Sequence, residues 1–370
     1  MRVKLKDIFD LQMGKTPSRS NLEYWNTTDY KWISIADLTK TSKYIFETKE
    51  YLSKSAIKDS GIKVIPANTV VMSFKLSIGK TAITKEDMYS NEAIMAFKDK
   101  HVINILPEYI FYLFKYKNWE EGSNKAVMGK TLNKATLSEI EVEICSIEKQ
   151  RQIVSILDKI MSSVDGRKQE LQLLDELIKA RFVEMFGDPV KNPKGWEVVT
   201  IGDIVTEVRY GTSKPAVEGG KYPYLRMNNL TADGHLDLND LKYIDIPDDE
   251  IEKCVVRKGD VLFNRTNSIE LVGKTVVFDL QEDMIIAGYI IRVRLNKRLL
   301  PEILSQYMNL EALKDILRSM AKGAVNQANI NAQELQSIKV YIPDMELQKQ
   351  FIEMKNQVDK SKVTVQKAFE

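Results

Sequence analysis

A set of short motifs occurs twice in this chain of 370 residues, in the same order both times. Corresponding motifs lie between 192 and 198 residues apart, so only small insertions distinguish the two copies. The pairs are LKDI (5–8) and IGDI (201–204), YKWISIADLT (30–39) and YPYLRMNNLT (222–231), GKT (79–81) and GKT (273–275), LPE (106–108) and LPE (300–302), LSEI (137–140) and LQSI (335–338), and EKQRQ (148–152) and ELQKQ (346–350). Chance rarely orders so many matches, and the period is far too long for a solenoid repeat. The sequence therefore predicts a duplicated domain.

Each copy has the pattern of a mixed α/β domain. Apolar runs at residues 69–74 and 260–264 predict short strands. Helices are expected at 107–117 and 301–317, and each begins with a proline, whose missing N–H costs least at the first helical position. The chain is long enough for two such domains, each with its own core.

A helical segment with a heptad pattern follows each copy. Residues 147–186 contain no proline and a single glycine, Gly166, at which a bend is possible. Apolar residues recur at intervals of three and four, as in a coiled-coil seam. The seam consists of Ile153, Leu157, Ile160, Val164, Leu171, Leu174 and Ile178 in the first helix and Phe351, Met354 and Val358 in the second. Because one amphipathic helix is marginal alone in water, we expect the two helices to pack antiparallel.

The two helices are expected to differ in length. Gly187 and Pro189 form the usual stop signal for the first helix. With an offset of 198 residues, Glu370 aligns with Gln172, so the second helix would be the shorter one. The helix pair would then be unequal unless a second chain completed it.

The composition is that of a soluble globular protein. The formal net charge is +2, from 54 basic and 52 acidic residues, which neither supports nor excludes nucleic-acid binding. No apolar run approaches the roughly 20 residues of a membrane span, and the N-terminus has no signal-peptide core, so we expect a cytoplasmic protein. Cys145 and Cys254 match no metal or redox spacing and are expected to be free thiols.

Several motifs together resemble a known family, the specificity subunits of type I restriction-modification systems. They are PANTVV (66–71), RFVEMFGDP (181–189), NPKGW (192–196), RKGDVL (257–262) and IPDMELQKQ (342–350). The resemblance covers nearly the whole chain. It implies an α+β fold in which two similar mixed α/β target-recognition domains are separated by two long antiparallel helices that form a coiled coil. The expected boundaries are 1–146 and 189–343 for the recognition domains, and 147–188 and 344–370 for the helices.

The resemblance also implies a function. Such a subunit reads a bipartite, asymmetric site in double-stranded DNA and positions two methylation subunits, which carry S-adenosylmethionine, and restriction subunits, which use ATP and Mg²⁺. The chain itself would hold no cofactor or metal and catalyse nothing. In agreement, we find no Asp-Pro-Pro-Tyr or Asn-Pro-Pro-Phe type motif, and the glycine of a phosphate-binding loop is replaced upstream of each Gly-Lys-Thr, by Phe74, Asn124 and Ser268. His101 and His235 fit no metal-ligand spacing.

Polar and basic clusters beside the repeated motifs are candidates for DNA contacts. Arginine suits guanine, asparagine and glutamine suit adenine, and cations hold phosphates. The candidates are Lys15, Thr16, Ser18, Arg19, Ser73, Lys75, Lys125, Lys130 and Asn133 in the first copy and Tyr210, Thr212, Ser213, Lys214, Arg226, Asn228, Asn229, Asn264, Arg265, Thr266, Asn267, Asn326, Gln327 and Asn329 in the second. The clusters differ between the copies, as expected for domains that read different half-sites. Any single one of these side chains could equally be an ordinary solvated or turn residue.

Two other functions remain open at this point. The chain could be a nuclease or methyltransferase with an embedded reading domain, which the missing catalytic motifs disfavour. It could also be a scaffold or regulatory subunit, which the short second helix would favour. Methyl transfer by the chain alone would support the first alternative, and failure to co-purify with a methylation subunit would support the second.

Overall fold

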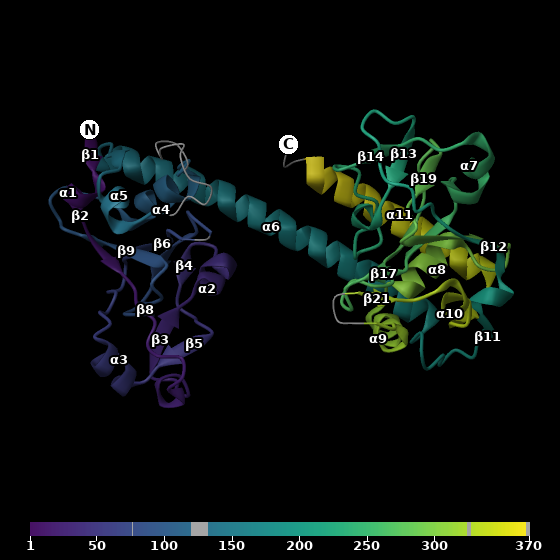
Figure 1. Cartoon of the computed structure of the whole chain (residues 1–370), viewed down its shortest axis with the longest axis horizontal. Helices are drawn as coiled ribbons and strands as arrows, with labels where there is room; N and C mark the ends of the chain where they lie inside the picture. The colour runs from purple at the N-terminus through teal and green to yellow at the C-terminus, as the bar shows by residue number, and fades with distance from the viewer. Residues whose placement is uncertain (76, 120–131, 324–326, 368–370) are drawn as a thin grey trace. The chain divides into compact units, whose positions relative to one another are not determined.

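The computed structural model describes residues 1–75, 77–119, 132–323 and 327–367 (Figure 1). By its internal contacts the chain forms two compact units, Met1–Ser163 and Val164–Glu370. The longest element, helix α6 (Ile147–Phe186), begins in the first unit and ends in the second. No helix in the described ranges is long and apolar enough to cross a bilayer.

The first unit contains three sheets. Strands β1 (Arg2–Lys4) and β10 (Glu141–Glu143) form a two-stranded antiparallel sheet. A five-stranded sheet has the order β2 (Phe9–Met13), β9 (Ile94–Asp99), β6 (Val70–Ser73), β7 (Thr81–Thr84) and β4 (Tyr44–Ile45). A three-stranded sheet has the order β5 (Glu50–Leu52), β3 (Tyr30–Ile33) and β8 (Tyr89–Ser90). The helices are α1 (Leu5–Ile8), α2 (Ile35–Lys40), α3 (Lys54–Ser60), α4 (Pro107–Tyr116) and α5 (Lys134–Ser138), with a 3-10 turn η1 (Leu22–Tyr24).

The second unit repeats this arrangement. Strands β11 (Glu197–Thr200) and β22 (Lys339–Ile342) pair like β1 and β10. A four-stranded sheet has the order β12 (Val205–Tyr210), β20 (Ile290–Leu295), β16 (Val261–Asn264) and β18 (Thr275–Val277), and another has the order β14 (Lys242–Ile244), β13 (Tyr222–Leu225), β19 (Met284–Ile286) and β15 (Val255–Val256). A short ladder joins β17 (Thr266–Asn267) and β21 (Ala328–Asn329). The helices are α7 (Asp248–Cys254), α8 (Pro301–Met308), α9 (Glu311–Met320), α10 (Ala332–Gln336) and α11 (Met345–Lys367), with 3-10 turns η2 (Ile201–Asp203) and η3 (Met227–Asn229).

The duplication extends to individual hydrogen bonds. The backbone N–H of Gly14 donates to the oxygen of Ile94 at 3.1 Å, and that of Gly211 donates to the oxygen of Ile290 at the same distance. A fully buried glutamine near the start of each long helix accepts the N–H that precedes a proline-led helix. Gln150 accepts from Leu106, and Gln348 accepts from Leu300, both at 2.9 Å. These glutamines explain why the EKQRQ and ELQKQ motifs recur: each satisfies buried backbone groups that water cannot reach.

The helix expected at 301–317 is wrong as a single element, because the structure divides it into α8 and α9. Asn309 ends α8, and its side-chain Nδ2 donates to the backbone oxygen of Thr275 at 2.6 Å. This tertiary bond turns the chain between the two helices, and it could not be read from local periodicity. The helix expected at 107–117 and the strands expected at 69–74 and 260–264 are present as α4, β6 and β16.

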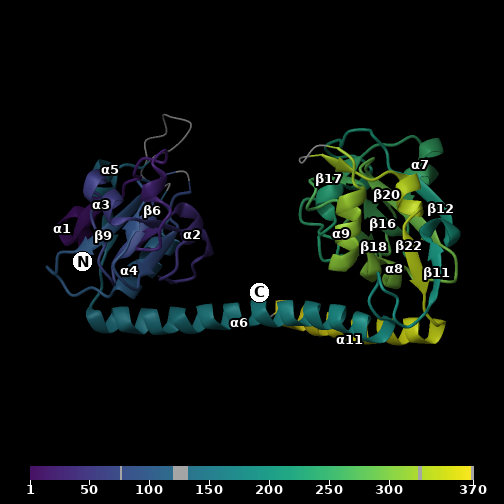
Figure 2. The same ribbon diagram turned by 90° about the horizontal axis from the view of Figure 1, so that it is seen from below.

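Antiparallel packing of α6 and α11 occurs within the second unit (Figure 2). The ring of Phe351 lies 5.2 Å from that of Phe182 and 5.5 Å from that of Phe186, whereas Lys362, further along α11, forms an ion pair with Asp175, which is earlier in α6. The two helices therefore run in opposite directions, as the heptad pattern predicts. Their seam joins the main hydrophobic core of this unit.

The predicted seam residues do not all lie in this helix pair. Leu174, Ile178, Met354 and Val358 contact the core around Phe351. Ile153 and Leu157 instead contact the core of the first unit, and Ile160 is 51% exposed. Val164 and Leu171 are half-buried. The prediction of one continuous seam is therefore wrong. The apolar residues of α6 contribute to two different cores, because each end of α6 packs on a separate domain body.

Gly166 does not interrupt α6, which is a single helix over 40 residues. A Cβ placed on Gly166 would have no heavy atom within 4 Å. We therefore expect Gly166→Ala to stabilise the protein by up to about 1 kcal/mol, because alanine loses less backbone entropy in a helix. Urea denaturation of the variant and the parent protein checks this, and a lower midpoint for the variant would contradict it.

Candidate nucleic-acid interface

Six of the fourteen second-copy candidates gather at one edge of the sheet that contains β12, β20, β16 and β18. Strand β20 pairs antiparallel with both β12 and β16, so β12 and β16 end at the edge where β20 begins. The register places Tyr210 opposite Ile291 and Asn264 opposite Ile290. The β17–β21 ladder continues from the end of β16. We call the group that this brings together the Arg265 edge, and it consists of Tyr210, Asn264, Arg265, Thr266, Asn267 and Asn329.

Arg265 is held at this edge by an aromatic ring and a backbone oxygen. Its guanidinium carbon lies 4.8 Å from the centroid of the Tyr210 ring, in cation–π contact. Its Nη1 donates to the oxygen of Gly288 at 3.4 Å, near the upper limit for a hydrogen bond. The Tyr210 hydroxyl accepts from the N–H of Ala332 at 2.8 Å, which fixes the ring. The buried Nε of Arg265 has no hydrogen-bond partner among the described residues.

Side-chain hydrogen bonds connect the other members of the Arg265 edge. The Thr266 hydroxyl donates to Oδ1 of Asn329 at 2.9 Å across the β17–β21 ladder. The Asn267 amide donates to Oδ1 of Asn264 at 3.3 Å. Asn264 is fully buried, and its Nδ2 finds no partner in the described chain. Because buried donors are nearly always satisfied, two such groups side by side in sequence mark this edge as unusual.

The remaining second-copy candidates lie elsewhere or serve the fold. Thr212 is linked to Arg265 through Gly288: the backbone oxygen of Thr212 accepts from the N–H of Gly288 at 2.8 Å, and the oxygen of Gly288 accepts from Arg265. Lys214 pairs with Glu250 and Arg226 with Asp240, so both cations are neutralised. Asn229 is buried and donates to the oxygen of Asp237 at 2.8 Å, a structural role. Exposed positions are Ser213, Asn228 and Gln327. Asn326 lies outside the described residues.

The corresponding edge of the first unit has different chemistry. Strands β2 and β6 end where β9 begins, with Met13 opposite Met95 and Ser73 opposite Ile94. The fully buried Ser73 hydroxyl donates to the oxygen of Ser77 and accepts from the N–H of Lys80, so it is satisfied within the fold. Phe74, which follows it, is 1% exposed. This edge therefore has a serine and a buried phenylalanine where the second unit has Asn264 and Arg265.

Two first-copy candidates, Thr16 and Arg19, contact acidic side chains. Thr16 donates to Glu92, and this hydrogen bond lowers the pKa of the Glu92 carboxyl, with a smaller contribution from the charges of Lys75 and Arg19. Arg19 pairs with Glu50, and its guanidinium lies 3.7 Å from the Trp25 ring centroid.

Four further candidates of this copy have local roles, and two cannot be placed. Lys15 donates to the backbone oxygen of Ser60, Ser18 bonds to Ser20, and Asn133 caps α5, so these are local structural contacts. Lys75 is half-buried, with Nζ 5.4 Å from the Phe74 ring. Lys125 and Lys130 lie outside the described residues.

Sequence reasoning missed two residues at these edges. Tyr289, 51% exposed, precedes β20, and its oxygen accepts from the N–H of Arg265 at 2.9 Å. Glu92 brings a negative charge to the first edge. An exposed tyrosine directly after the glycine of a turn (Gly288-Tyr289) was the available signal for the first. No sequence signal linked Glu92 to Thr16, because 76 residues separate them.

The lysines of the two Gly-Lys-Thr motifs in the described residues, Lys80 and Lys274, have structural contacts. Lys274 is 8% exposed and donates to the backbone oxygens of Met227 at 3.1 Å and Leu230 at 2.6 Å. Burial lowers the pKa of Lys274. In the first copy, Lys80 donates to the hydroxyl of Thr39 at 2.5 Å. Both lysines thus tie a strand to the same repeated segment, which explains why the motif recurs.

A second buried lysine in this unit makes stability depend on pH. Lys314 is 8% exposed, its Nζ donates to the oxygen of Gly273 at 2.6 Å, and burial lowers its pKa from 10.5 to about 8. The unfolded chain therefore binds more protons between these values, so this residue makes stability rise from pH 8 to about pH 10.5. Below pH 8 its charge is a constant cost.

We expect Lys314→Met to stabilise the protein at pH 7 by about 2 kcal/mol, once the lost hydrogen bond to Gly273 is subtracted. The gain should shrink towards pH 10.5. Denaturation of both proteins at several pH values measures it, with Lys322→Met as the exposed control. A difference between Lys314→Met and the parent that does not change with pH would contradict the prediction.

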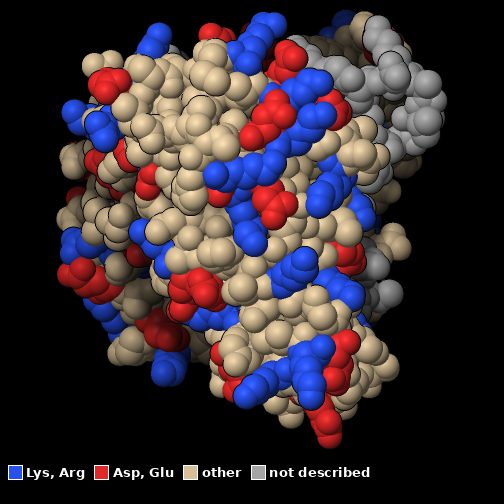
Figure 3. Space-filling model, turned by 90° about the vertical axis from the view of Figure 1, so that its left-hand side faces the viewer, with Lys and Arg blue, Asp and Glu red and all other residues tan. Residues whose placement is uncertain are grey.

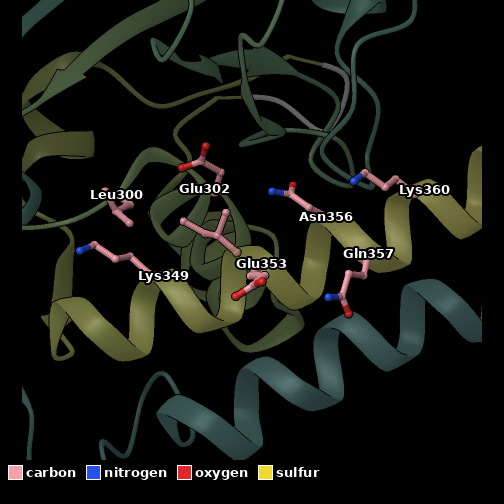
Figure 4. Close-up of a pocket in the computed structure, with 8 residues that line it drawn as sticks. Leu300, Glu302, Lys349, Glu353, Asn356, Gln357 and Lys360 are labelled. Carbon is pink, nitrogen blue, oxygen red and sulfur yellow. The ribbon is translucent and has the colours of Figure 1, made fainter.

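One face of the molecule (Figure 3) and a groove along α11 both carry mixed charge. On the face shown in Figure 3, basic and acidic side chains are interspersed. A groove with a volume of about 510 Å³ lies between α11 and the start of α8, and its lining residues are drawn in Figure 4. Its charged lining residues are Glu302, Lys349, Glu353 and Lys360. It lacks the largely apolar lining of a small-molecule site. No group of three or more histidine, cysteine or acidic side chains in the described ranges could hold a metal, and both cysteines are free thiols.

The family of the chain follows from its match to known proteins. Residues 1–176 and again 193–368 match the type I restriction modification DNA specificity domain. The chain belongs to this family and contains its domain twice, in agreement with the duplication seen in sequence and structure.

Two characterised relatives are similar over more than half of the chain. The specificity subunit of the type I restriction enzyme MjaIX from Methanocaldococcus jannaschii is 30% identical over 250 residues, which cover 61% of this chain and 57% of that protein. The EcoKI specificity subunit from Escherichia coli is 25% identical over 268 residues, covering 68% of this chain and 58% of that protein. The chain thus spans less than two thirds of the length of these relatives.

Solved structures share the fold over the whole chain. A chain from a study of the assembly and conformational transition of the type I R-M system superposes with a TM-score of 0.58 at 19% identity, covering 100% of this chain and 92% of that one. The S subunit from M. genitalium superposes with a TM-score of 0.51 at 14% identity, covering 100% and 91%. The predicted fold, two mixed α/β domains with a pair of long antiparallel helices, is therefore confirmed.

Proposed function

We propose that this protein is the DNA-specificity subunit of a type I restriction-modification complex, and that it reads a bipartite, asymmetric site in double-stranded DNA. The observation that carries the proposal is the double match to the DNA specificity domain, one match for each structural unit. The relatives are specificity subunits by name, and two reading domains in one chain suit a site with two parts.

The two sheet edges support an asymmetric site. They have the same backbone framework, since Gly14 and Gly211 make the same hydrogen bond, but they differ in side chains. One presents Met13 and Glu92, which accepts a hydrogen bond from Thr16, and the other presents Tyr210 and Arg265. Groups that read base edges must differ where the bases differ. Two domains with one scaffold and different edge chemistry would read two different half-sites.

The proposal assigns catalysis to partner subunits. Two methylation subunits would bind S-adenosylmethionine and dock on the α6–α11 helix pair, and restriction subunits would use ATP and Mg²⁺. This chain would hold no cofactor of its own and would act in the cytoplasm, where the DNA is. The mixed-charge groove along α11 has the polar character of the rim of a protein–protein interface.

The test is to express the chain with its methylation subunit in a host without restriction and to map methylated adenines across the genome. We expect one bipartite, asymmetric motif. Exchange of residues 1–146 for the same domain of another family member should change one half of the motif and leave the other intact. Methylation without sequence preference, or a motif altered in both halves, would contradict the proposal, as would methyl transfer by the chain alone.

A further inference from the structure

Among the three candidate arginines, Arg265 is the one without a carboxylate partner in the described chain. We propose that Arg265 reads a guanine in the half-site of the second unit, with Tyr210 as the residue that positions it. This inference rests on the proposed function and deepens it, because it names a base and the side chain that contacts it.

Charge neutralisation separates Arg265 from the other two candidate arginines. Arg19 forms an ion pair with Glu50, and Arg226 forms one with Asp240. Arg265 has no carboxylate partner among the described residues, and its charge faces an aromatic ring instead. A half-buried cation without a counter-ion is costly unless a partner supplies acceptors. DNA would supply them.

The orientation of the guanidinium suits a base edge. An arginine fork needs two acceptors side by side, and O6 and N7 of guanine provide them in the major groove. Among the described residues, Gly288 alone accepts from the Arg265 head group, through Nη1 and over a long 3.4 Å bond. The Tyr210 ring restricts the plane of the fork, and the hydroxyl of this tyrosine is fixed by Ala332. A pre-oriented fork loses less entropy on binding, which favours base reading.

Arg265 is flanked by exposed tyrosines and by a buried amide. Tyr210 is 42% exposed and Tyr289 is 51% exposed, and both lie beside Arg265. Next to it, the orphan amide Nδ2 of Asn264 is a second buried donor without a partner in the described chain. The corresponding residue of the first unit is Phe74, buried in the core, so that unit has no arginine at this place. Guanine reading at this edge would therefore belong to one half-site only.

The experiment uses the full chain in complex with its methylation subunit and a double-stranded DNA library in which the motif is randomised one position at a time. Arg265→Gln and Arg265→Lys are compared with the parent protein, and Arg226→Gln is the control that removes an ion-paired arginine. We expect Arg265→Gln to lose roughly 5- to 150-fold in discrimination at one guanine of the second half-site, the range given by a single bidentate contact. All other positions and the Arg226→Gln control should keep the parent preference.

A modified base tests the contact directly. Replacement of that guanine by 7-deazaguanine removes the N7 acceptor, so it should weaken binding by the parent complex and have little further effect on Arg265→Gln. Tyr210→Phe should keep the guanine preference because the ring remains, whereas Tyr210→Ala should lose the preference. The melting temperature of Tyr210→Ala should stay close to that of the parent protein, which shows that the variant is folded. Arg265→Lys keeps the charge and the stem, so it remains informative if the glutamine variant fails to fold.

Three outcomes overturn the inference. Unchanged preference at every position in a folded Arg265→Gln complex rules out base reading by this residue. A uniform loss over all sequences assigns Arg265 to a phosphate instead. Loss of discrimination at a base of the first half-site would contradict the assignment of Arg265 to the half-site of the second unit. If the parent complex itself shows no bipartite preference, the proposed function fails and this inference fails with it. If the parent complex reads a bipartite site and Arg265→Gln reads it unchanged, only this inference fails.

Discussion

Gly211→Ala should abolish folding of the second unit. A Cβ on Gly211 would lie 2.1 Å from the backbone oxygen of Ile286 and 2.3 Å from that of Ala287, and backbone atoms in a sheet cannot move aside. The expected destabilisation is on the order of 5 kcal/mol or more, beyond the range of ordinary substitutions. Calorimetry should show the loss of one unfolding transition while the other remains.

The first copy offers a matched test of this prediction. A Cβ on Gly14 would lie 2.2 Å from the backbone oxygen of Asn91 and 2.3 Å from that of Ser90. Gly14→Ala should therefore remove the other transition, and Gly166→Ala, which meets no atom, should remove neither. Retention of both transitions in Gly211→Ala would show that the sheet tolerates a side chain at this crossing.

Arg292→Ala should cost about 3–5 kcal/mol, because it removes a fully buried charge from an ion-pair network and leaves a cavity. The Arg292 guanidinium donates to Glu207 at 2.7 Å and to the backbone oxygen of Val255, and Arg294 joins Glu207 to Asp260. Without Arg292, the buried backbone oxygen of Val255 loses this donor, and Oε2 of Glu207 keeps only the hydrogen bond from Arg294. Denaturant titration of the folded variant measures the loss.

An exposed ion pair in the same unit is the control. Arg298 pairs with Glu197 at 2.6 Å, and both side chains are more than 40% exposed. Arg298→Ala should change stability by less than about 1 kcal/mol. Equal effects of the two substitutions would mean that burial of Arg292 does not determine its contribution. In the first copy the corresponding residue is Ala96, so the network belongs to the second copy alone.

The elements that sequence reasoning predicted well are those specified by local signals. Helix α4 begins at Pro107, α6 ends directly before Gly187, whose φ is 88°, and the repeated glutamines lie at equivalent helix starts. What failed depended on partners distant in sequence. The break at Asn309 needs Thr275, and the burial of Arg292 needs Glu207, 85 residues earlier.

The sequence predicted individual residues of the candidate site, but it did not predict which of them lie together on one surface. Clusters at 210–214, 264–267 and 326–329 were separate in sequence, and only the order β12-β20-β16 brings Tyr210 to Arg265. Contacts between residues distant in sequence also exclude some candidates. Arg226 and Lys214 form ion pairs with acidic residues 14 and 36 positions away, which no local sequence pattern predicts. Residue type alone therefore overestimated the interface, and pairing of charge reduced it.

Every cluster of buried apolar side chains in the described chain draws its residues from one unit only. Free-energy changes caused by substitutions in separate cores are expected to add, with little coupling between the copies. A gene of this kind can accumulate changes in one half while the other half keeps its stability and its preference. Natural variation in such chains should accordingly be uneven, with one copy drifting as the other stays constant.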